Sequence, residues 1–128
     1  MGLDIRVKQS GAVTLLEVSG RLTLGLETEH LRSRVHELFE EGHQWMLLDI
    51  GGVQTVDSAG VGELVSVYAS IARRGGALKF LHPSRKLRDM FHITHLDNLL
   101  EYYDDEQQAL AAFGQHSAAK AALVDQQD

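Results

Sequence analysis

The stretch from Trp45 to Gly62 decides the fold, and it reads WMLLDIGGVQTVDSAGVG. Its segment Met46–Ile50 is apolar apart from Asp49, which is typical of a strand covered on both faces. The polar pair Asp57-Ser58 then precedes a helical pattern of apolar residues. We therefore predict a buried central strand, a loop from Gly51 to Ser58 at the carboxyl end of that strand, and a helix that begins near Ser58. Binding positions of α/β proteins gather at such strand ends.

Hydrophobic spacing elsewhere predicts alternating strands and helices. Aliphatic runs on either side of Gly11 predict an opening hairpin, and apolar residues three and four apart predict helices. In chain order, the predicted elements are strands Asp4–Val7 and Val13–Val18, a connection Gly20–Gly25, a helix Glu29–Glu41 capped by Thr28, the strand Met46–Ile50, a helix from Val61 to the Gly75-Gly76 pair, the strand Ala77–Leu81, a short helix capped by Ser84, a strand Leu99–Tyr103, and a helix opened by Asp104 and Gln107. This order predicts an α/β fold with a mixed β-sheet and about four helices packed on it.

The length and composition are those of one globular domain. The chain has 128 residues, of which 44% are hydrophobic. We assign residues 1–113 to the domain. The alanine-rich residues 114–128 are predicted to form a C-terminal tail that is partly helical or disordered.

Charge and residue usage exclude several classes of function. The net charge of -6 and the pI of about 5.6 leave no basic surface for a phosphate backbone, so direct nucleic-acid binding is not expected. The chain has no cysteine, which excludes disulfides, thiolate metal sites and a cysteine nucleophile. Its first residues do not resemble a signal peptide, and no apolar run approaches the roughly 18 residues of a membrane span. We expect a cytoplasmic protein.

The helix predicted after Ser58 presents two faces on a wheel of about 100° per residue. The sheet-facing stripe consists of Val61, Leu64, Val65, Tyr68 and Ile71. Beside it runs a strip of mostly small side chains, which consists of Ser58, Gly62, Ser66, Ala69 and Arg73. A partner's backbone or helix can lie close against this strip, with Ser58 at its exposed end. Gly60 and Gly62 each cost about 1 kcal/mol relative to alanine inside a helix, so their place in the first turn needs an explanation.

The residues alone leave a capping role for Asp57 or Ser58 open, since both types are favoured helix N-caps. A catalytic Ser58 is disfavoured, because the chain lacks a Gly-x-Ser-x-Gly elbow and no histidine has a spacing that identifies it as a base. His92 and His95 lack a third ligand, so no zinc site is expected. Neither phosphate-binding glycine motif occurs. We predict no metal and no organic cofactor.

Asp49 suggests a more distant alternative. It ends its strand as the phospho-accepting aspartate of a response-regulator receiver does. That interpretation needs further carboxylates after the first strand to hold Mg²⁺, and Asp4 lies before or at the start of that strand.

The segment from Leu47 to Gly62, with its signature Asp57-Ser58-Ala59-Gly60, resembles the STAS domain, and in particular the bacterial anti-sigma factor antagonists. The resemblance covers roughly Asp4 to Phe113 and includes Gly20-Arg21-Leu22 and the Gly75-Gly76 turn. Many relatives carry an acid shortly after the glycine before the first helix, where this chain has Arg21-Leu22-Thr23-Leu24. The partner-facing loop, and with it the cognate kinase, is therefore expected to differ.

The resemblance implies a regulatory protein-binding module rather than an enzyme. The unphosphorylated antagonist would bind an ATP-dependent serine kinase that doubles as an anti-sigma factor, and so free a sigma factor. That kinase would phosphorylate Ser58, and a PP2C-type phosphatase would reverse the step. The residues expected to bind the partner are Asp57, Ser58, Ala59, Gly60, Gly62, Ser66 and Ala69. The alternative is a STAS scaffold subunit of a lipid-transport or stress-signalling complex, in which Ser58 is never modified.

Overall fold

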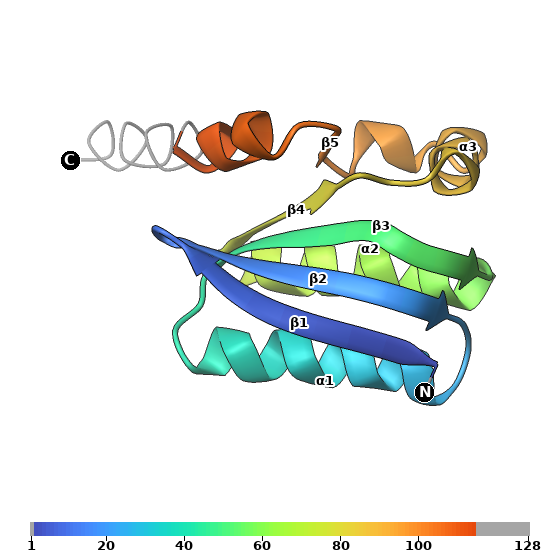
Figure 1. Cartoon of the computed structure of the whole chain (residues 1–128), viewed down its shortest axis with the longest axis horizontal. Coiled ribbons are helices and arrows are strands. Elements are labelled where there is room, and N and C mark those ends of the chain that lie inside the picture. Colours follow the sequence, from blue (N-terminus) through green and yellow to red (C-terminus); the bar gives the residue numbers. More distant parts are fainter. Residues whose placement is uncertain (1, 115–128) are drawn as a thin grey trace.

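The computed structural model describes residues 2–114 and contains one five-stranded mixed sheet (Figure 1). The strands lie in the order β1-β2-β3-β4-β5; the first pair is antiparallel and the other pairs are parallel. The elements are β1 (Leu3–Ser10), β2 (Val13–Leu22), α1 (Leu26–Glu40), β3 (Trp45–Val56), α2 (Ser58–Arg73), β4 (Ala77–Leu81), α3 (Arg85–Ile93), η1 (Leu96–Asn98), β5 (Tyr102–Tyr103) and a C-terminal helix that begins at Glu106 and is described as far as Gly114. The predicted fold class is confirmed. Apart from Gly114, the predicted tail lies outside the described residues.

The opening hairpin is confirmed and is longer than predicted. Its register runs from Leu3 opposite Gly20 to Ser10 opposite Val13. Because β2 continues to Leu22, the predicted connection from Gly20 to Gly25 is wrong in its first half. Gly20 has a φ of 102°, and a Cβ there would lie 2.3 Å from the carbonyl oxygen of Gly2. Gly20 thus serves close strand pairing rather than a loop.

The central strand also extends further than predicted. β3 continues through Gly51 and Gly52 to Val56, so the predicted loop from Gly51 to Ser58 is wrong and only Asp57 separates β3 from α2. A Cβ on Gly52 would lie 2.7 Å from the Cβ of Ser19, and a Cβ on Gly51 would lie 3.0 Å from the Cβ of His82. The glycines therefore allow close packing inside a strand. The prediction of a strand end fails here because glycine is more common in turns than in strand interiors.

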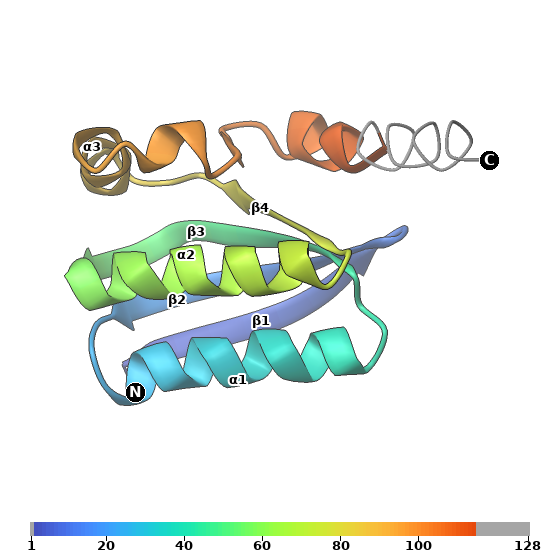
Figure 2. The same cartoon turned by 180° about the vertical axis from the view of Figure 1, so that it is seen from behind.

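Helices α1 and α2 cover one face of the sheet, as the view from behind shows (Figure 2). The predicted start of α1 is wrong by three residues: the helix begins at Leu26 after Gly25, and Thr28 lies inside it and donates to the Gly25 carbonyl at 3.0 Å. The two helices are joined by an ion pair in which Arg32 Nη2 lies 2.6 Å from Oε1 of Glu63, a residue only 5% exposed. Its paired charge makes burial of the Glu63 carboxylate tolerable.

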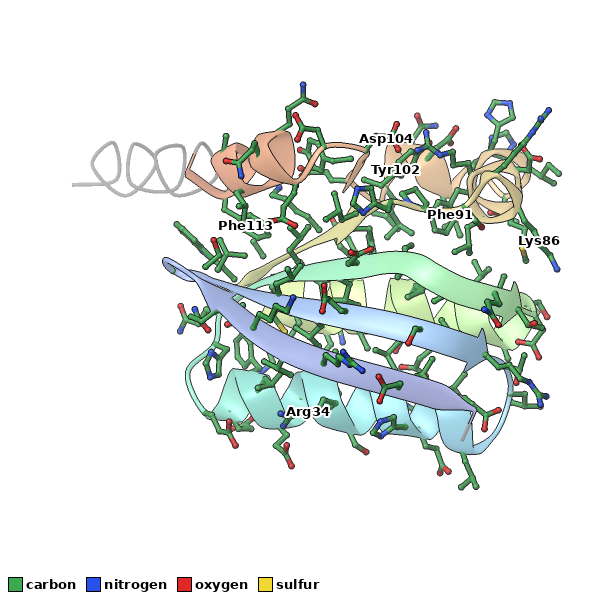
Figure 3. The ribbon with its side chains drawn as sticks, viewed as in Figure 1. Arg34, Lys86, Phe91, Tyr102, Asp104 and Phe113 are labelled. Carbon is green, nitrogen blue, oxygen red and sulfur yellow. The ribbon has the colours of Figure 1, made fainter. Side chains whose placement is uncertain are left out.

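The C-terminal helix packs on the other side of the sheet. Ala109 and Phe113 are fully buried in a second apolar cluster with strand residues such as Leu15 and Leu47. The Phe113 ring lies 5.9 Å from the Trp45 ring and sits between the helix and the sheet (Figure 3). The predicted opening pair is corrected by one residue, because Oδ1 of Asp105, not of Asp104, accepts from the Gln107 amide at 3.0 Å.

The region between β4 and the C-terminal helix follows the prediction only in part. Ser84 caps α3 by accepting from the Leu87 amide at 3.2 Å, as expected. The predicted strand Leu99–Tyr103 is reduced to Tyr102–Tyr103, which pairs with the end of β4. Phe91 of α3 packs against Tyr102 with ring centroids 5.7 Å apart (Figure 3).

Candidate functional site

Asp57 caps α2, and this leaves Ser58 without a capping role. The Asp57 backbone is extended, and its Oδ1 accepts from the Gly60 amide at 2.8 Å. Ser58 is the first residue of the helix and is exposed. Within residues 2–114 its hydroxyl makes no hydrogen bond. Of the two capping candidates in the sequence, the structure thus assigns the cap to Asp57.

The Asp57 carboxylate also joins α2 to the loop between β2 and α1. Its Oδ2 accepts from the Leu24 amide at 3.1 Å. Both the loop and the start of α2 lie at the same end of the molecule (Figures 1 and 2). The hydrogen bonds from the Leu24 and then the Gly60 amide lower the pKa of Asp57. The carboxylate therefore remains ionised beside Ser58 well below neutral pH.

Gly60 is explained by packing inside the protein. A Cβ at this position would lie 2.1 Å from the carbonyl oxygen of Leu22, at the end of β2. Gly60 is buried, whereas Gly62 is exposed and a Cβ there would meet nothing within 4 Å. Close packing thus explains the glycine at position 60 but not the glycine at position 62. Only Gly62 is available to a partner directly, and Gly60 lies beneath the surface to which Ser58 belongs.

The strip along α2 faces directly away from the sheet. The buried residues of the helix are Gly60, Val61, Glu63, Leu64, Val67 and Ile71. Their mean direction on a helical wheel is nearly opposite Gly62, so the predicted sheet-facing stripe is rotated from the observed one. Val65 and Tyr68 are only half-buried. Ser58, Gly62, Ser66 and Arg73 are exposed and Ala69 is half-exposed, so the strip forms the outer ridge of α2.

The sequence patterns did not single out two exposed leucines beside this site. Leu24 and Leu26, on either side of Gly25, are each 77% exposed. Leu24 is the residue whose amide binds Asp57. The available signal was that Leu24, in the predicted connection, and Leu26, just after it, lie outside any periodic apolar pattern.

Histidine and acidic side chains within residues 2–114 form pairs rather than a metal-binding cluster. Among residues 2–114 there is no group of three or more histidine, aspartate or glutamate side chains that could hold a metal ion. His82 pairs instead with Asp49, and His92 pairs with Asp97. The same part of the chain has no helix that is long and apolar enough to cross a bilayer.

The five-stranded mixed sheet and its helices form an α/β module that presents an exposed Ser58 next to the Asp57 cap at the start of α2. The STAS domain model matches residues 4–109 of this chain. The chain therefore belongs to the STAS domain family.

Proteins named as anti-sigma factor antagonists are among the relatives with similar sequences. A Thermotoga neapolitana protein, provisionally named as one, is 28% identical over 89 residues, which are 68% of this chain and 79% of that protein. The anti-sigma-B factor antagonist of Bacillus subtilis is 26% identical over 101 residues, which are 79% of this chain and 91% of the relative.

Solved structures share the fold. A crystal structure of a Thermotoga maritima protein, provisionally named an anti-sigma factor antagonist, has a TM-score of 0.74 and 24% identity, and the match covers 84% of this chain and 92% of that one. The phosphorylated form of the Bacillus cell fate determinant SpoIIAA has a TM-score of 0.66 and 17% identity, with 86% and 99% covered. At these identities the likeness establishes the fold alone.

The two glycines of the first turn give a matched pair of substitutions. We expect Gly60→Ala to destabilise the protein by roughly 1–3 kcal/mol or more, because the new methyl group would overlap the Leu22 carbonyl. Gly62→Ala, with open space at the same turn, is expected to stabilise it by about 0.5–1 kcal/mol. Urea unfolding of both variants measures the difference. Equal effects of the two substitutions would contradict the assigned packing role of Gly60.

The double hydrogen bond of Asp57 predicts a linked titration. Because its folded pKa is lowered, its stabilising effect is complete above the unfolded value of about 3.9 and is lost as pH falls through the folded pKa. We expect the Leu24 and Gly60 amide resonances to shift together in that acidic window, with a midpoint below 3.9, in two-dimensional NMR spectra. Asp57→Ala should abolish the shared transition and lower the melting temperature by about 3–6 °C. Separate midpoints for the two amides would argue against the shared carboxylate.

Proposed function

We propose that this chain is an anti-sigma factor antagonist and that Ser58 is its phosphate acceptor. The observation that carries the proposal is the division of roles between neighbours: Asp57 makes the capping hydrogen bond, and the Ser58 hydroxyl stays exposed. A serine that capped the helix would hold its oxygen against the amides of the first turn, whereas the Ser58 hydroxyl is free of that role and exposed. Membership of the STAS family and the names of the relatives support the antagonist part of the proposal.

The proposed partner of the unphosphorylated form is a serine kinase that also acts as an anti-sigma factor. Binding would occupy this kinase and release its sigma factor, so the chain would regulate transcription without touching nucleic acid. The docking surface would be the outer ridge of α2, where Ser58, Gly62, Ser66 and Ala69 present little relief, together with the neighbouring Asp57-to-Gly60 turn. A PP2C-type phosphatase would remove the phosphate, and all of these steps belong to the cytoplasm.

Electrostatics gives the switch its direction. A phosphate at neutral pH adds up to about -2, which takes the net charge from -6 to about -8. The added charge lies next to the ionised Asp57 carboxylate. At the exposed N-terminus of α2 water and the helix dipole tolerate the dianion. Under a bound partner it would lose water, and a penalty of about 3 kcal/mol weakens binding by about 100-fold. Little refolding of the chain is needed.

The first test uses two serines on the same face of one helix. Wild type, Ser58→Ala and Ser66→Ala are incubated with ATP and each serine kinase of the anti-sigma type encoded in the same genome. We expect one phosphate by intact-mass measurement on wild type and on Ser66→Ala, and none on Ser58→Ala. Ser66 is also exposed, about two turns further along the helix, so it controls for accessibility. Unmodified wild type with every such kinase would reject the proposal.

The second test concerns the charge. Ser58→Asp should bind the kinase about 100-fold more weakly than wild type, whereas Ser58→Asn, which is similar in size and uncharged, should lose much less. Isothermal titration against the same kinase measures both. Equal affinity of the aspartate variant and wild type would refute electrostatic release.

A further inference from the structure

Two large apolar side chains next to Ser58 remain exposed. Leu24 and Leu26 are each 77% exposed, and within residues 2–114 the other large exposed apolar side chains are Ile93 and Leu99. Single exposed leucines are ordinary on protein surfaces. These two lie on either side of Gly25 at the entrance to α1, beside the cap of α2. The pair is therefore a local apolar patch at the candidate site.

The patch is held in place by hydrogen bonds to its backbone and to its neighbours. The Leu24 amide donates to Asp57 at 3.1 Å, and the Thr28 hydroxyl donates to the Gly25 carbonyl at 3.0 Å. Thr23, the residue before Leu24, donates from its hydroxyl to Glu27 at 2.9 Å. Because its backbone is already ordered, the patch loses little conformational entropy when a partner covers it.

An enzyme that modifies Ser58 works close to this patch. Phosphoryl transfer needs the terminal phosphate of ATP in line with the serine oxygen at near-contact distance, with water excluded. Leu24 is one hydrogen bond away from the side chain of Asp57, the residue next to Ser58. A kinase surface that encloses Ser58 therefore comes close to the backbone of Leu24, and Leu26 lies two residues further along.

We propose that Leu24 and Leu26 are the apolar anchors that seat this chain on its serine kinase, and that Asp57 positions them relative to Ser58. This inference rests on the proposed function. The patch fits an apolar pocket in the partner next to its nucleotide site. On the α1 side it is bordered by Glu27 and Glu29 in the first turn of the helix, so the adjoining rim of the pocket carries lysine or arginine. Leu24 and Leu26 thus determine which kinase recognises the chain.

The test measures affinity for the kinase that phosphorylates wild-type Ser58. In titrations with the full unphosphorylated chain, Leu24→Ala and Leu26→Ala should each raise Kd by about tenfold or more, because each removes a buried apolar anchor. Ile93→Ala is the matched control: Ile93 is 75% exposed but lies at the end of α3, and its Kd should stay within twofold of wild type. Thermal melts of the three variants should match wild type, since all three side chains are exposed.

The outcomes separate this inference from the proposed function. If the kinase binds and phosphorylates wild type and both leucine variants bind it with normal affinity, the leucines are not anchors. Ser58 then remains the acceptor. An equal loss for Ile93→Ala also overturns the anchors, because the effect would not be local. If no such kinase binds or phosphorylates wild type, both the proposed function and the proposed kinase partner of the leucine patch are overturned. As a second readout, Glu29→Gln should reduce the salt dependence of binding, and an unchanged salt dependence counts against the basic rim.

Discussion

The structure depends on one close contact, between the first turn of α2 and the end of β2. Gly60 lies so near the Leu22 carbonyl that no side chain fits between them. Two residues beyond Leu22, the Leu24 amide binds Asp57, which caps the same turn. The strand end, the loop and the helix start are thereby fixed to one another. β3 leads directly into this turn because it continues to Val56. Gly51 and Gly52 allow that length, since they pack closely against Ser19 and His82.

This contact explains how one turn combines rigidity with an accessible hydroxyl. A helix start needs hydrogen-bond acceptors for its free amides, and serine often supplies one. Here the preceding aspartate does so, and its carboxylate also holds the neighbouring loop. Ser58 contributes nothing to the cap, so a chemical change at its oxygen leaves the capping hydrogen bonds in place. Under the proposed function, phosphorylation of Ser58 would change the charge of this surface while the fold keeps its geometry.

The sequence allowed prediction of the fold class and of α2, because strong periodicity, an acid–serine cap and a glycine pair all indicated the same helix. It failed where a local preference was overridden by contacts distant in sequence. Gly51 and Gly52 resemble a turn until Ser19 and His82 are placed against them. The outward direction of the Ser58-to-Ala69 strip depended on Val67 and Glu63 being buried, and the Glu63 carboxylate is buried only because Arg32 reaches it from α1. No local pattern carries that information.

Internal packing constrains some residues of this site and leaves others unconstrained. The cap, the buried Gly60 and the exposed serine depend on the backbone geometry of this turn. Leu24 and Leu26 differ from these residues, because each side chain is 77% exposed and packing within residues 2–114 does not require leucine there. Side chains without an internal role are free to vary with the partner, whereas Gly60 is not. Under the proposed function, the α2 turn would determine what is done to Ser58, and Leu24 and Leu26 would determine which kinase does it.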